Sequence, residues 1–426
     1  KRSKKSAKSS DTPHYENVPF EVPSSWVWCR LEDIAYVASG STPDKTCFVE
    51  NGVPYIKMYN LRNQKIDFAY HPQYITEEVH NGKLQRSRTE VGDLIMNIVG
   101  PPLGKLAIIP TTLPQANFNQ AAVLIRPYKF KEVLVSYLKV YLEEMSEINS
   151  IATRGSAGQV NISLTQSQNM RIPIPPLNEV RRIIEEVSKY DILIDSLKQN
   201  ITDIQNLIAY TKSKILDLAI HGKLVLQDPN DEPAIELLKR INPDFTPCDN
   251  GHYPVGWIET ILGELFSHNT GKALNSSNKE GIFKDYLTTS NVYWNKFDFT
   301  AIKQMPFKES ELNKCTVTKG DLLVCEGGDI GRSAIWNYDY DICIQNHIHR
   351  LRPKIDLCVP FYYYTFAYLK ENNLIGGKGI GLLGLSSNAL HKIEMPLPPL
   401  AEQQRIVQKI EELFSVLDNI QNALEV

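Results

Sequence analysis

The chain contains one long segment twice, and this duplication constrains the fold more than any other feature. The stretch PSSWVWCRLEDI that begins at Pro23 returns as PVGWIETILGEL at Pro254, which aligns Trp26 with Trp257. Four further matches follow in the same order, and the offset between the copies falls only from 231 to 223 residues. A repeat of this length exceeds the roughly 20–50 residues of solenoid and propeller units and corresponds to a whole domain. The sequence therefore predicts two homologous domains in tandem.

Each copy ends in a heptad pattern that follows a Pro-Pro-Leu sequence. After the first one, apolar residues recur in alternating steps of four and three, which keeps them facing a partner helix over about five heptads. We expect the two helices to form an antiparallel coiled coil, in which the segment 177–219 would reach roughly 60 Å. A surface helix packed on its own domain is the alternative. The expected helix-packing positions are Ile183, Val187, Ile194, Leu197, Ile201, Ile204 and Ile208 in the first copy, and Ile406, Ile410, Leu413, Leu417 and Ile420 in the second.

The boundaries between these parts follow from composition. We predict a basic, Ser-rich tail at 1–17, a first domain at 18–177, a long helix at 178–221, a linker with one short helix at 222–250, a second domain at 251–400 and a second long helix at 401–426. The stretches ending in AVLIRP and HIHRLRP read as buried strands, and VSYLKVYLEEMSEI and PFYYYTFAYLKENN read as helices. Short strands mixed with short helices predict an α+β fold for each domain.

Composition excludes some classes of protein. Hydrophobic residues make up 42% and charged residues 22% of the 426, which is typical of a globular protein. We see no apolar run of about 18 residues and no signal-peptide pattern, so we expect a cytoplasmic location and no membrane partner. The seven cysteines are scattered and never form a CxxC, which indicates reduced packing residues. Because the net charge is only −3, any nucleic-acid surface must be a local basic patch.

Several short motifs suggest enzymes, but none is complete. GPPLGKL at Gly100 resembles a phosphate-binding Walker A loop, yet it is one residue short and lacks the final Ser or Thr. GIGLLG at Gly379 fits GxGxxG without a strand-turn-helix context, and NPDF at Asn242 lacks the second proline of an amino-methyltransferase motif. His347 and His349 have no apparent third ligand for a metal. We therefore predict no catalytic residue, no metal site and no cofactor in this chain.

Two similar domains joined by long helices are suited to reading two separated sites on DNA. The duplicated P-x-x-W start, the GDL/I core, the PPL-x-E sequences at Pro175 and Pro398, and the central run LAIHGKLVLQDPNDEPAIELLKRI together resemble the specificity (S) subunit of a type I restriction-modification system. This resemblance covers residues 18–426, and the central run is its most specific part.

The resemblance implies a non-catalytic subunit that binds double-stranded DNA. Each domain would be a target-recognition domain for one half of a bipartite sequence, and the helices would set the unread spacer in a pseudo-twofold arrangement. The helices would also dock two methyltransferase (M) subunits, which use S-adenosylmethionine to methylate adenine, and restriction (R) subunits would add ATP- and magnesium-dependent translocation and cleavage. The second helix stops at Val426, whereas the first continues into the HGKL run, so the docking surface is expected to be asymmetric or truncated.

Base contacts are expected from polar side chains on loops, because Arg and Lys donate, and Asn and Gln both donate and accept, at base edges. The same residue types are also common in solvated loops. The candidates in the first copy are Lys57, Asn60, Arg62, Arg86, Arg88, Arg154, Ser156, Gln159 and Asn161. Those in the second copy are Asn291, Tyr293, Lys296, Lys378, Ser387 and Asn388. We expect Trp26 and Trp257 to anchor the domain cores.

Two other functions remain open at this point. The chain would be a sequence-specific DNA methyltransferase or nuclease in its own right if it held a methyl-donor or metal site. It would be a coiled-coil scaffold without DNA readout if its domains lacked a basic face. Changing the length of the first helix by one heptad should alter only the spacer of a bipartite target, and this distinguishes sequence readout from both alternatives.

Overall fold

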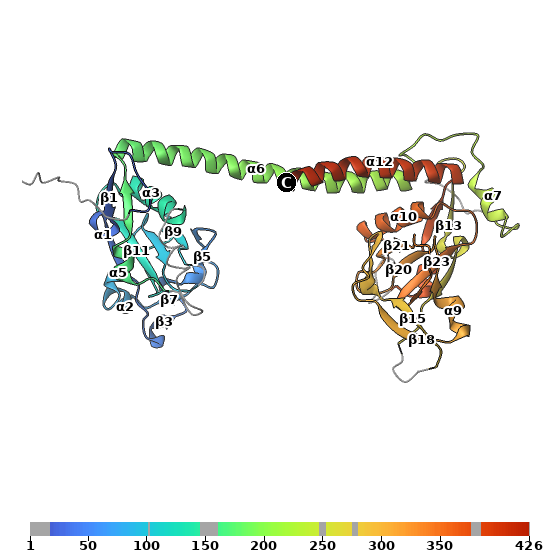
Figure 1. Ribbon diagram of the computed structural model, residues 1–426, viewed down its shortest axis with the longest axis horizontal. Coiled ribbons are helices and arrows are strands. Elements are labelled where there is room, and N and C mark those ends of the chain that lie inside the picture. Colours follow the sequence, from blue (N-terminus) through green and yellow to red (C-terminus); the bar gives the residue numbers. More distant parts are fainter. Residues whose placement is uncertain are drawn as a thin grey trace, which may run out of the picture. The chain divides into compact units, whose positions relative to one another are not determined.

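A computed structural model describes residues 18–100, 103–144, 161–246, 253–274, 280–375 and 385–425. The chain divides into two compact units, unit 1 at Lys1–Ser196 and unit 2 at Leu197–Val426. The boundary lies inside one continuous helix, α6 (Leu177–Ile220). The two units have the same architecture, as the duplicated sequence predicts, and each mixes short strands with short helices (Figure 1).

Unit 1 contains two four-stranded sheets, a two-stranded ladder and a hairpin. The first sheet has the order β2 (Ala35–Ser39), β11 (Ala122–Pro127), β8 (Leu94–Asn97), β9 (Leu106–Ile108), and the second β10 (Asn117–Phe118), β4 (Val53–Ile56), β7 (Tyr74–Ile75), β3 (Phe48–Val49). The ladder pairs β1 (Val27–Arg30) with β12 (Arg171–Ile174), and the hairpin pairs β5 (Leu61–Arg62) with β6 (Lys65–Ile66). The helices are α1 (Leu31–Ile34), α2 (Glu77–Asn81), α3 (Lys131–Glu144) and α5 (Leu164–Gln168).

The first sheet of unit 1 is buried on both faces. Met96 and Ile125 point to one face, where they pack in a cluster with Leu138 of α3. Ile95 and Leu124 point to the other face and pack with Phe118 of the second sheet. This explains why β8 and β11 are almost uniformly apolar and do not alternate with polar residues.

Unit 2 has a similar layout, and its second sheet differs from that of unit 1 in one edge strand. Its first sheet runs β14 (Phe266–Thr270), β23 (Ile348–Pro353), β20 (Leu322–Cys325), β21 (Ser333–Ile335), and its second β18 (Lys303–Phe307), β15 (Ile282–Leu287), β22 (Ile342–Ile344), β19 (Thr316–Val317). The ladder pairs β13 (Ile258–Ile261) with β24 (Glu394–Leu397), and the hairpin pairs β16 (Val292–Tyr293) with β17 (Lys296–Phe297). The helices are α7 (Ala234–Lys239), α8 (Leu262–Leu265), α9 (Glu309–Cys315), α10 (Val359–Glu371), α11 (Ser387–His391) and α12 (Leu400–Leu424).

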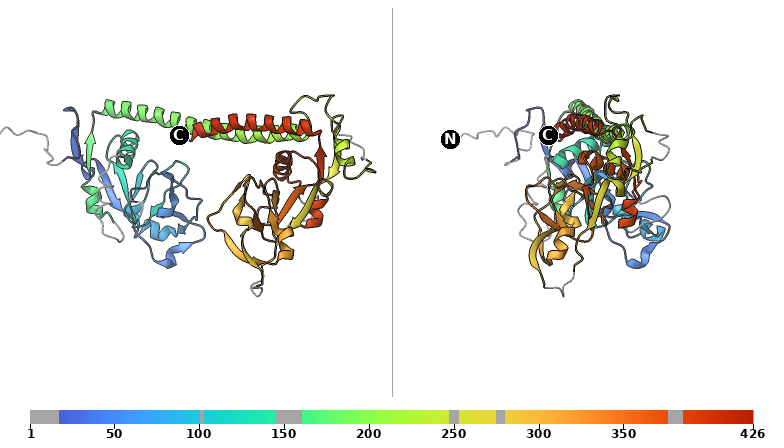
Figure 2. Two further views of the ribbon diagram at one scale, coloured as in Figure 1. Left: turned by 45° about the vertical axis from the view of Figure 1, so that its right-hand side comes forward. Right: turned by 90° about the vertical axis from the view of Figure 1, so that its right-hand side faces the viewer.

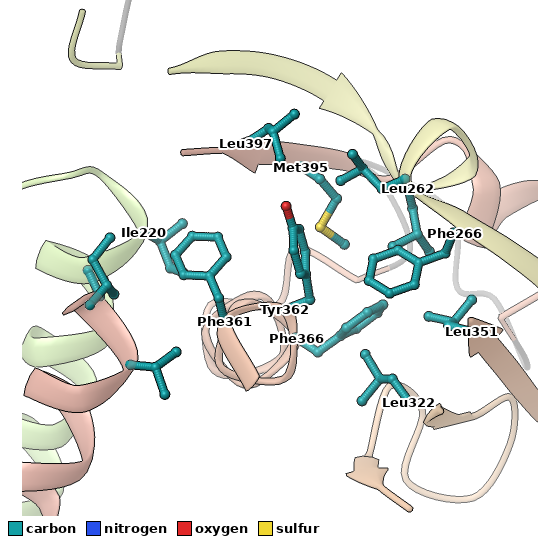
Figure 3. Close-up of a cluster of buried hydrophobic side chains, with 14 of the residues drawn as sticks. Ile220, Leu262, Phe266, Leu322, Leu351, Phe361, Tyr362, Phe366, Met395 and Leu397 are labelled. Atoms are coloured by element: carbon teal, nitrogen blue, oxygen red, sulfur yellow. The ribbon is translucent and has the colours of Figure 1, made fainter. Parts of the chain in front are cut away.

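Helix α10 supplies the centre of the core of unit 2. Figure 3 shows Phe361, Tyr362 and Phe366 projecting from this helix, with Ile220 of α6 beyond Phe361 and Leu351 of the sheet beyond Phe366. The aromatic rings therefore join the long helices and the sheet into one cluster. Leu237 and Leu238 of α7 are fully buried in the same cluster, so the linker that follows α6 is part of the folded domain.

The expected strands ending in AVLIRP and HIHRLRP are confirmed as β11 and β23, and the expected helices as α3 and α10. The short linker helix is also confirmed, although α7 ends at Lys239 and not at Ile241. Trp257 is buried as expected, with 1% of its surface exposed, whereas Trp26 is only partly buried.

The coiled coil forms over only part of the expected length. Helix α12 lies beside the C-terminal half of α6 and runs antiparallel to it (Figure 2), and Lys212 of α6 pairs with Asp418 of α12 at 2.5 Å. The expected packing positions Ile208, Ile406 and Ile410 are buried there. Leu413 and Leu417 are partly buried against the same cluster.

The packing expected for the remaining heptad positions is corrected. Val187 is half-buried, and Ile183 packs on the core of unit 1, so the first turns of α6 belong to that domain. Positions farther along α6 are exposed because α12 has 25 residues and α6 has 44, which leaves part of α6 without an opposing helix among the described residues. The last expected position on α12, Ile420, is also exposed. The exposed fractions are Ile194 46%, Leu197 53%, Ile201 36%, Ile204 38% and Ile420 44%.

Candidate nucleic-acid interface

In both units a tight hairpin follows a buried asparagine. Asn60 is fully buried, its Oδ1 accepts from the backbone N–H of Lys57 at 2.9 Å, and its Nδ2 donates to the carbonyl oxygen of Asp67 at 3.1 Å. Asn291 makes the equivalent hydrogen bonds to Thr288 and Asp298. The prediction that these two amides contact bases is therefore corrected, because their hydrogen-bonding groups already hold the shape of the loop.

The hairpins themselves carry the exposed polar residues. Arg62 lies on β5, with its guanidinium carbon 4.0 Å from the centre of the Tyr70 ring and its Nε 3.7 Å from Asp67. Tyr293 occupies the equivalent place on β16 and is 39% exposed, and it pairs across the hairpin with the exposed Lys296. A cation and an aromatic side chain at one exposed tip are suited to contacts with phosphate and with a sugar or a thymine methyl group.

A second cation joins each hairpin from the loop that precedes β9 or β21. Lys105 and Arg332 are equivalent residues, because Gly104-Lys105 aligns with Gly331-Arg332 in the duplicated sequence. Lys105 lines a cavity of about 530 Å³ together with Tyr59, Arg62 and Gln64. Arg332 lies with its guanidinium carbon 5.2 Å from the centre of the Tyr293 ring.

One hydrogen bond in each unit joins the hairpin to the residue that directly follows the cation, and so holds the cation beside the hairpin tip. Gln64 Oε1 accepts from the N–H of Leu106 at 2.8 Å, and the N–H of Asn295 donates to the carbonyl oxygen of Ser333 at 3.1 Å. Leu106 and Ser333 directly follow the two cations. Lys105 and Arg332 are not among the residues predicted from the sequence, although both lie in the glycine-rich matches between the two copies, and this repetition was the available signal.

The same loop also contacts the last group of candidates. The N–H of Ile162 donates to the carbonyl oxygen of Ile98 at 2.8 Å, and the N–H of Leu385 donates to that of Glu326 at 3.0 Å. Exposed Asn161 therefore lies beside this loop in unit 1, and half-buried Ser387 and exposed Asn388 begin α11 in unit 2. The candidates outside the described residues are Arg154, Ser156, Gln159 and Lys378.

Three parts lie together in each unit: the hairpin, the loop that carries Lys105 or Arg332, and the segment whose backbone is hydrogen-bonded to that loop. We call these three parts the recognition edge of the unit. In unit 1 it comprises residues 61–66, 98–100, 103–105 and 161–162, and in unit 2 residues 292–297, 326–332 and 385–388. Three predicted residues lie elsewhere in unit 1. Lys57 lies with its Nζ 5.5 Å from the Phe48 ring centre, Arg86 donates to Ser41 Oγ at 3.2 Å, and Arg88 donates to Asn81 Oδ1 at 2.7 Å.

The cations of the fold interior differ from these in their partners. Arg126 Nη2 and Arg352 Nη2 each lie 2.6 Å from a buried aspartate, Asp93 and Asp321, so both have a structural role. Among the residues that the structure describes, Lys105 and Lys296 have no carboxylate within ion-pair distance. Lys296 is exposed and Lys105 is half-buried, and a cation without an internal ion pair can neutralise a phosphate group.

Within the residues that the structure describes, no group of three or more His, Cys, Asp and Glu side chains is placed to hold a metal ion. In the same ranges no helix combines the length and the apolar character needed to cross a membrane.

Comparison with known proteins agrees with the duplicated architecture. The family model described as "Type I restriction modification DNA specificity domain" matches residues 23–206 and again 254–426. The chain is 24% identical to the specificity subunit of the type I restriction enzyme EcoEI from Escherichia coli, over 96% of this chain and 80% of that protein. It is 22% identical to the EcoKI specificity subunit from E. coli strain K12, over 94% and 84% of the two chains.

A solved structure shows the same fold. The crystal structure of the HsdS subunit from Thermoanaerobacter tengcongensis aligns with a TM-score of 0.57 and 19% identity, over 95% of each chain. Because the family model covers both copies, and both copies fold alike, the chain belongs to the type I restriction-modification DNA specificity domain family.

Proposed function

We propose that this chain is the DNA-recognition subunit of a type I restriction-modification complex and that each unit reads one half of a bipartite target. The observation that carries the proposal is the repeated recognition edge. Both units hold a hairpin with a buried asparagine at its start and place an equivalent cation, Lys105 or Arg332, against it. Two copies of one arrangement with different side chains are suited to two different half-sites.

Within each edge we assign two kinds of contact. Lys105 and Lys296 are flexible point charges and are suited to phosphate groups, which fix the position of the protein on DNA. Arg62 can donate two hydrogen bonds at once, Asn161 and Asn388 can each donate and accept, and all three are suited to base edges. Tyr293 offers a partly exposed ring for a sugar or a thymine methyl group. The two half-sites would then differ in sequence, because Arg62 of unit 1 and Tyr293 of unit 2 are different residue types at equivalent positions.

Helix α6 is proposed to set the unread spacer between the half-sites. It is continuous over 44 residues, which corresponds to roughly 66 Å at the rise of an α-helix. One turn of B-DNA spans about 34–36 Å, so a helix of this length is suited to half-sites that are one to two turns apart.

We further propose that the long helices dock two methyltransferase (M) subunits and that restriction (R) subunits join the same complex in the cytoplasm. The M subunits would supply S-adenosylmethionine for adenine methylation, and the R subunits would use ATP and magnesium. This chain would hold none of these cofactors and would act by positioning its partners. The relatives that support this assignment are themselves described as specificity subunits of type I restriction enzymes.

The alternative functions are not favoured. A methyltransferase or nuclease in its own right would need a catalytic centre that the family model does not describe, and a scaffold without readout does not account for two DNA specificity domains.

The test is to change one recognition edge at a time. The chain is combined with the M subunit of its own system, and the methylated target is determined for wild type and for Arg62→Ala and Tyr293→Ala. We expect each substitution to relax the sequence requirement of a different half-site and to leave the other unchanged. An equal loss of methylation at all sequences would instead indicate phosphate contact without readout.

A further inference from the structure

Unit 2 contains a chain of three hydrogen-bonded histidines that has no counterpart in unit 1. His391 Nε2 lies 3.1 Å from His268 Nδ1, and His268 Nε2 lies 2.8 Å from His349 Nδ1. His349 Nε2 lies 2.7 Å from the carbonyl oxygen of Leu385. These contacts connect α11, β14 and β23 to Leu385, which lies two residues before the start of α11.

The three hydrogen bonds end at a carbonyl oxygen, and this determines which ring nitrogen of each neutral histidine carries the proton. The oxygen of Leu385 can only accept, so His349 Nε2 must donate and, in a neutral ring, its Nδ1 must accept. His268 therefore donates from Nε2 and accepts at Nδ1, and His391 donates from Nε2 to it. All three contacts are satisfied by one set of neutral tautomers. A proton on His268 Nδ1 would face the N–H of His391, and the contact would persist only if His391 moved its own proton to Nδ1.

The duplication identifies what unit 1 has at the same three positions. The β2–β11 pairing sets Ala35 opposite Pro127, and the β14–β23 pairing sets Phe266 opposite Pro353, which aligns Val37 with His268 and Val123 with His349. Helices α5 and α11 each follow a capping serine, Ser163 or Ser386, so the last residue of α5, Gln168, aligns with His391.

Unit 1 therefore holds its helix without a titratable group. Gln168 Nε2 donates to the backbone carbonyl oxygen of Val37 at 3.3 Å, and Val123 is fully buried in the apolar cluster. Neither contact changes between pH 4 and pH 8, because neither valine nor glutamine titrates there. The two units therefore hold equivalent helices, α5 and α11, by different side-chain contacts.

The surroundings of the histidines favour the neutral form. His349 is fully buried, His268 is half-buried, and His391 is exposed and gives water access to the chain. Burial lowers the pKa of His268 to about 4, with the neighbouring His349 and His391 adding to the effect, and burial also lowers the pKa of His349.

Few other charged groups shift the pKa values of His268 and His349. Arg350 on β23 disfavours the charged form of His268, and Glu326 after β20 favours the charged form of His349. Helix α8, which packs against α11, carries Glu264, and Lys392 follows His391, while β14 has no other titratable residue.

We infer that the three histidines are a pH-sensitive latch that holds α11 and Leu385 on the sheet, so that acidification weakens DNA recognition by unit 2 and spares unit 1. The effect on DNA rests on the proposed function, because Ser387 and Asn388 lie in the recognition edge of unit 2. The latch itself does not depend on it. Release of α11 exposes His268 and lets it take up a proton at its ordinary pKa.

The direction of the pH effect follows from this difference. Above pH 6.5, the ordinary pKa of histidine, the folded and the released states are both neutral and the latch has its full strength. As the pH falls from 6.5 toward about 4, only the released state binds the proton, and the opening equilibrium rises roughly tenfold per pH unit for each proton taken up.

The first test needs no DNA. Amide hydrogen exchange, expressed as protection factors, is compared for residues 385–391 and for the equivalent residues 162–168 between pH 7.5 and pH 5. We expect protection in 385–391 to be constant down to about pH 6.5 and then to fall about tenfold per pH unit, while 162–168 stay constant. Equal behaviour of the two segments would overturn the latch, whatever the chain does with DNA.

The second test replaces the latch by the residues of unit 1. The triple variant His268→Val, His349→Val, His391→Gln is compared with wild type by footprinting. The DNA carries the sequence that is found to be methylated in the test of the proposed function. Wild type should lose protection of the unit 2 half-site below pH 6.5 and keep that of the other, whereas the triple variant should protect both equally at each pH. Loss of both half-sites together in wild type would contradict the inference, and no footprint at any pH would contradict the proposed function instead.

If the triple variant does not fold, nitrogen NMR of wild-type histidines decides the same question. The latch requires His268 to be neutral and protonated only at Nε2 at pH 6. A charged ring or the opposite tautomer would overturn it.

Discussion

The indole Nε1 of Trp257 donates to Glu402 Oε2 at 2.9 Å, and this bond joins the residue before β13 to the first turn of α12. Glu402 Oε1 also accepts from Gln227 Nε2 at 2.7 Å, so the linker after α6 is tied to the same carboxylate. The equivalent residues of unit 1, Trp26 and Glu179, do not form this bond, and Trp26 Nε1 has no partner among the described residues. One duplicated sequence motif therefore has two different structural roles.

The first prediction follows from that difference. Glu402→Gln replaces one of two acceptor oxygens by an amide donor, and it should lower the free energy of unfolding of unit 2 by about 1–3 kcal/mol because a buried donor is left without an acceptor. Glu179→Gln is the matched control and should change stability by less than about 0.5 kcal/mol. Urea unfolding followed by hydrogen exchange of each unit measures both. Equal effects of the two substitutions would show that the Trp257 bond contributes nothing.

The same carboxyl group gives a pH dependence opposite to that of the histidines. Burial raises the pKa of Glu402 above 4.5, with partial compensation from Trp257 and Gln227. A raised pKa favours folding at low pH, so the contribution of Glu402 should be lost as the pH rises from 4.5 through the raised value. The stabilities of wild type and Glu402→Gln, measured from pH 4 to pH 8, should therefore converge with rising pH. Parallel curves would contradict the role of Glu402.

Asp321 anchors the turn before β20 by accepting from Arg352 Nε at 2.8 Å and from the N–H of Thr318 at 2.8 Å. Asp321→Asn should destabilise unit 2 by about 1–3 kcal/mol, since the amide nitrogen cannot accept a hydrogen bond. Asp93→Asn should do the same in unit 1, where Asp93 binds Arg126. Thermal unfolding of both variants checks this. A stable variant in one unit alone would show that the two turns are not equivalent.

Substitution at the exposed apolar positions of α6 should change the free energy of unfolding very little. Ile204→Ala removes a side chain that is 38% exposed and should cost less than about 0.5 kcal/mol. Ile215→Ala removes a side chain that is 7% exposed in the core of unit 2 and should cost about 2–5 kcal/mol. Denaturant unfolding of the isolated chain distinguishes them. A large cost at Ile204 would mean that this position is covered in solution.

Lys105 should act through phosphate. Lys105→Gln should weaken binding to all DNA sequences and reduce the slope of log K against log salt by about 1. Lys139 is the control, because it is already paired with Glu143 at 2.9 Å on α3, and Lys139→Gln should leave the slope unchanged. Fluorescence anisotropy at several salt concentrations makes the comparison. A change of sequence preference in Lys105→Gln would assign it to base readout instead.

The repeated architecture was predictable from the sequence because aligned matches such as Gly320-Asp321 and Pro396–Leu400 record the same turns in both copies. The long helix was equally clear, since its heptads and the preceding prolines are local signals. The extent of the coiled coil was not predictable, because exposure of Leu197 and Ile201 depends on where α12 ends in space.

The recognition residues were harder to predict for a related reason. Asn60 and Arg62 are two residues apart and equally polar, yet one is buried in its own loop and the other is exposed, and only the backbone geometry of the hairpin separates them. The histidine latch joins residues 123 positions apart, so no local pattern could indicate it.

The most direct test of the central claim is a map of N6-methyladenine on plasmid DNA at single-base resolution, after the chain is combined with the M subunit of its own system. We predict one bipartite motif with a constant gap, and a different constant gap when one heptad is inserted into α6 at the exposed segment 191–197. Methylation at a single uninterrupted motif, or a gap that does not respond to the insertion, would contradict two recognition units separated by a helix of fixed length.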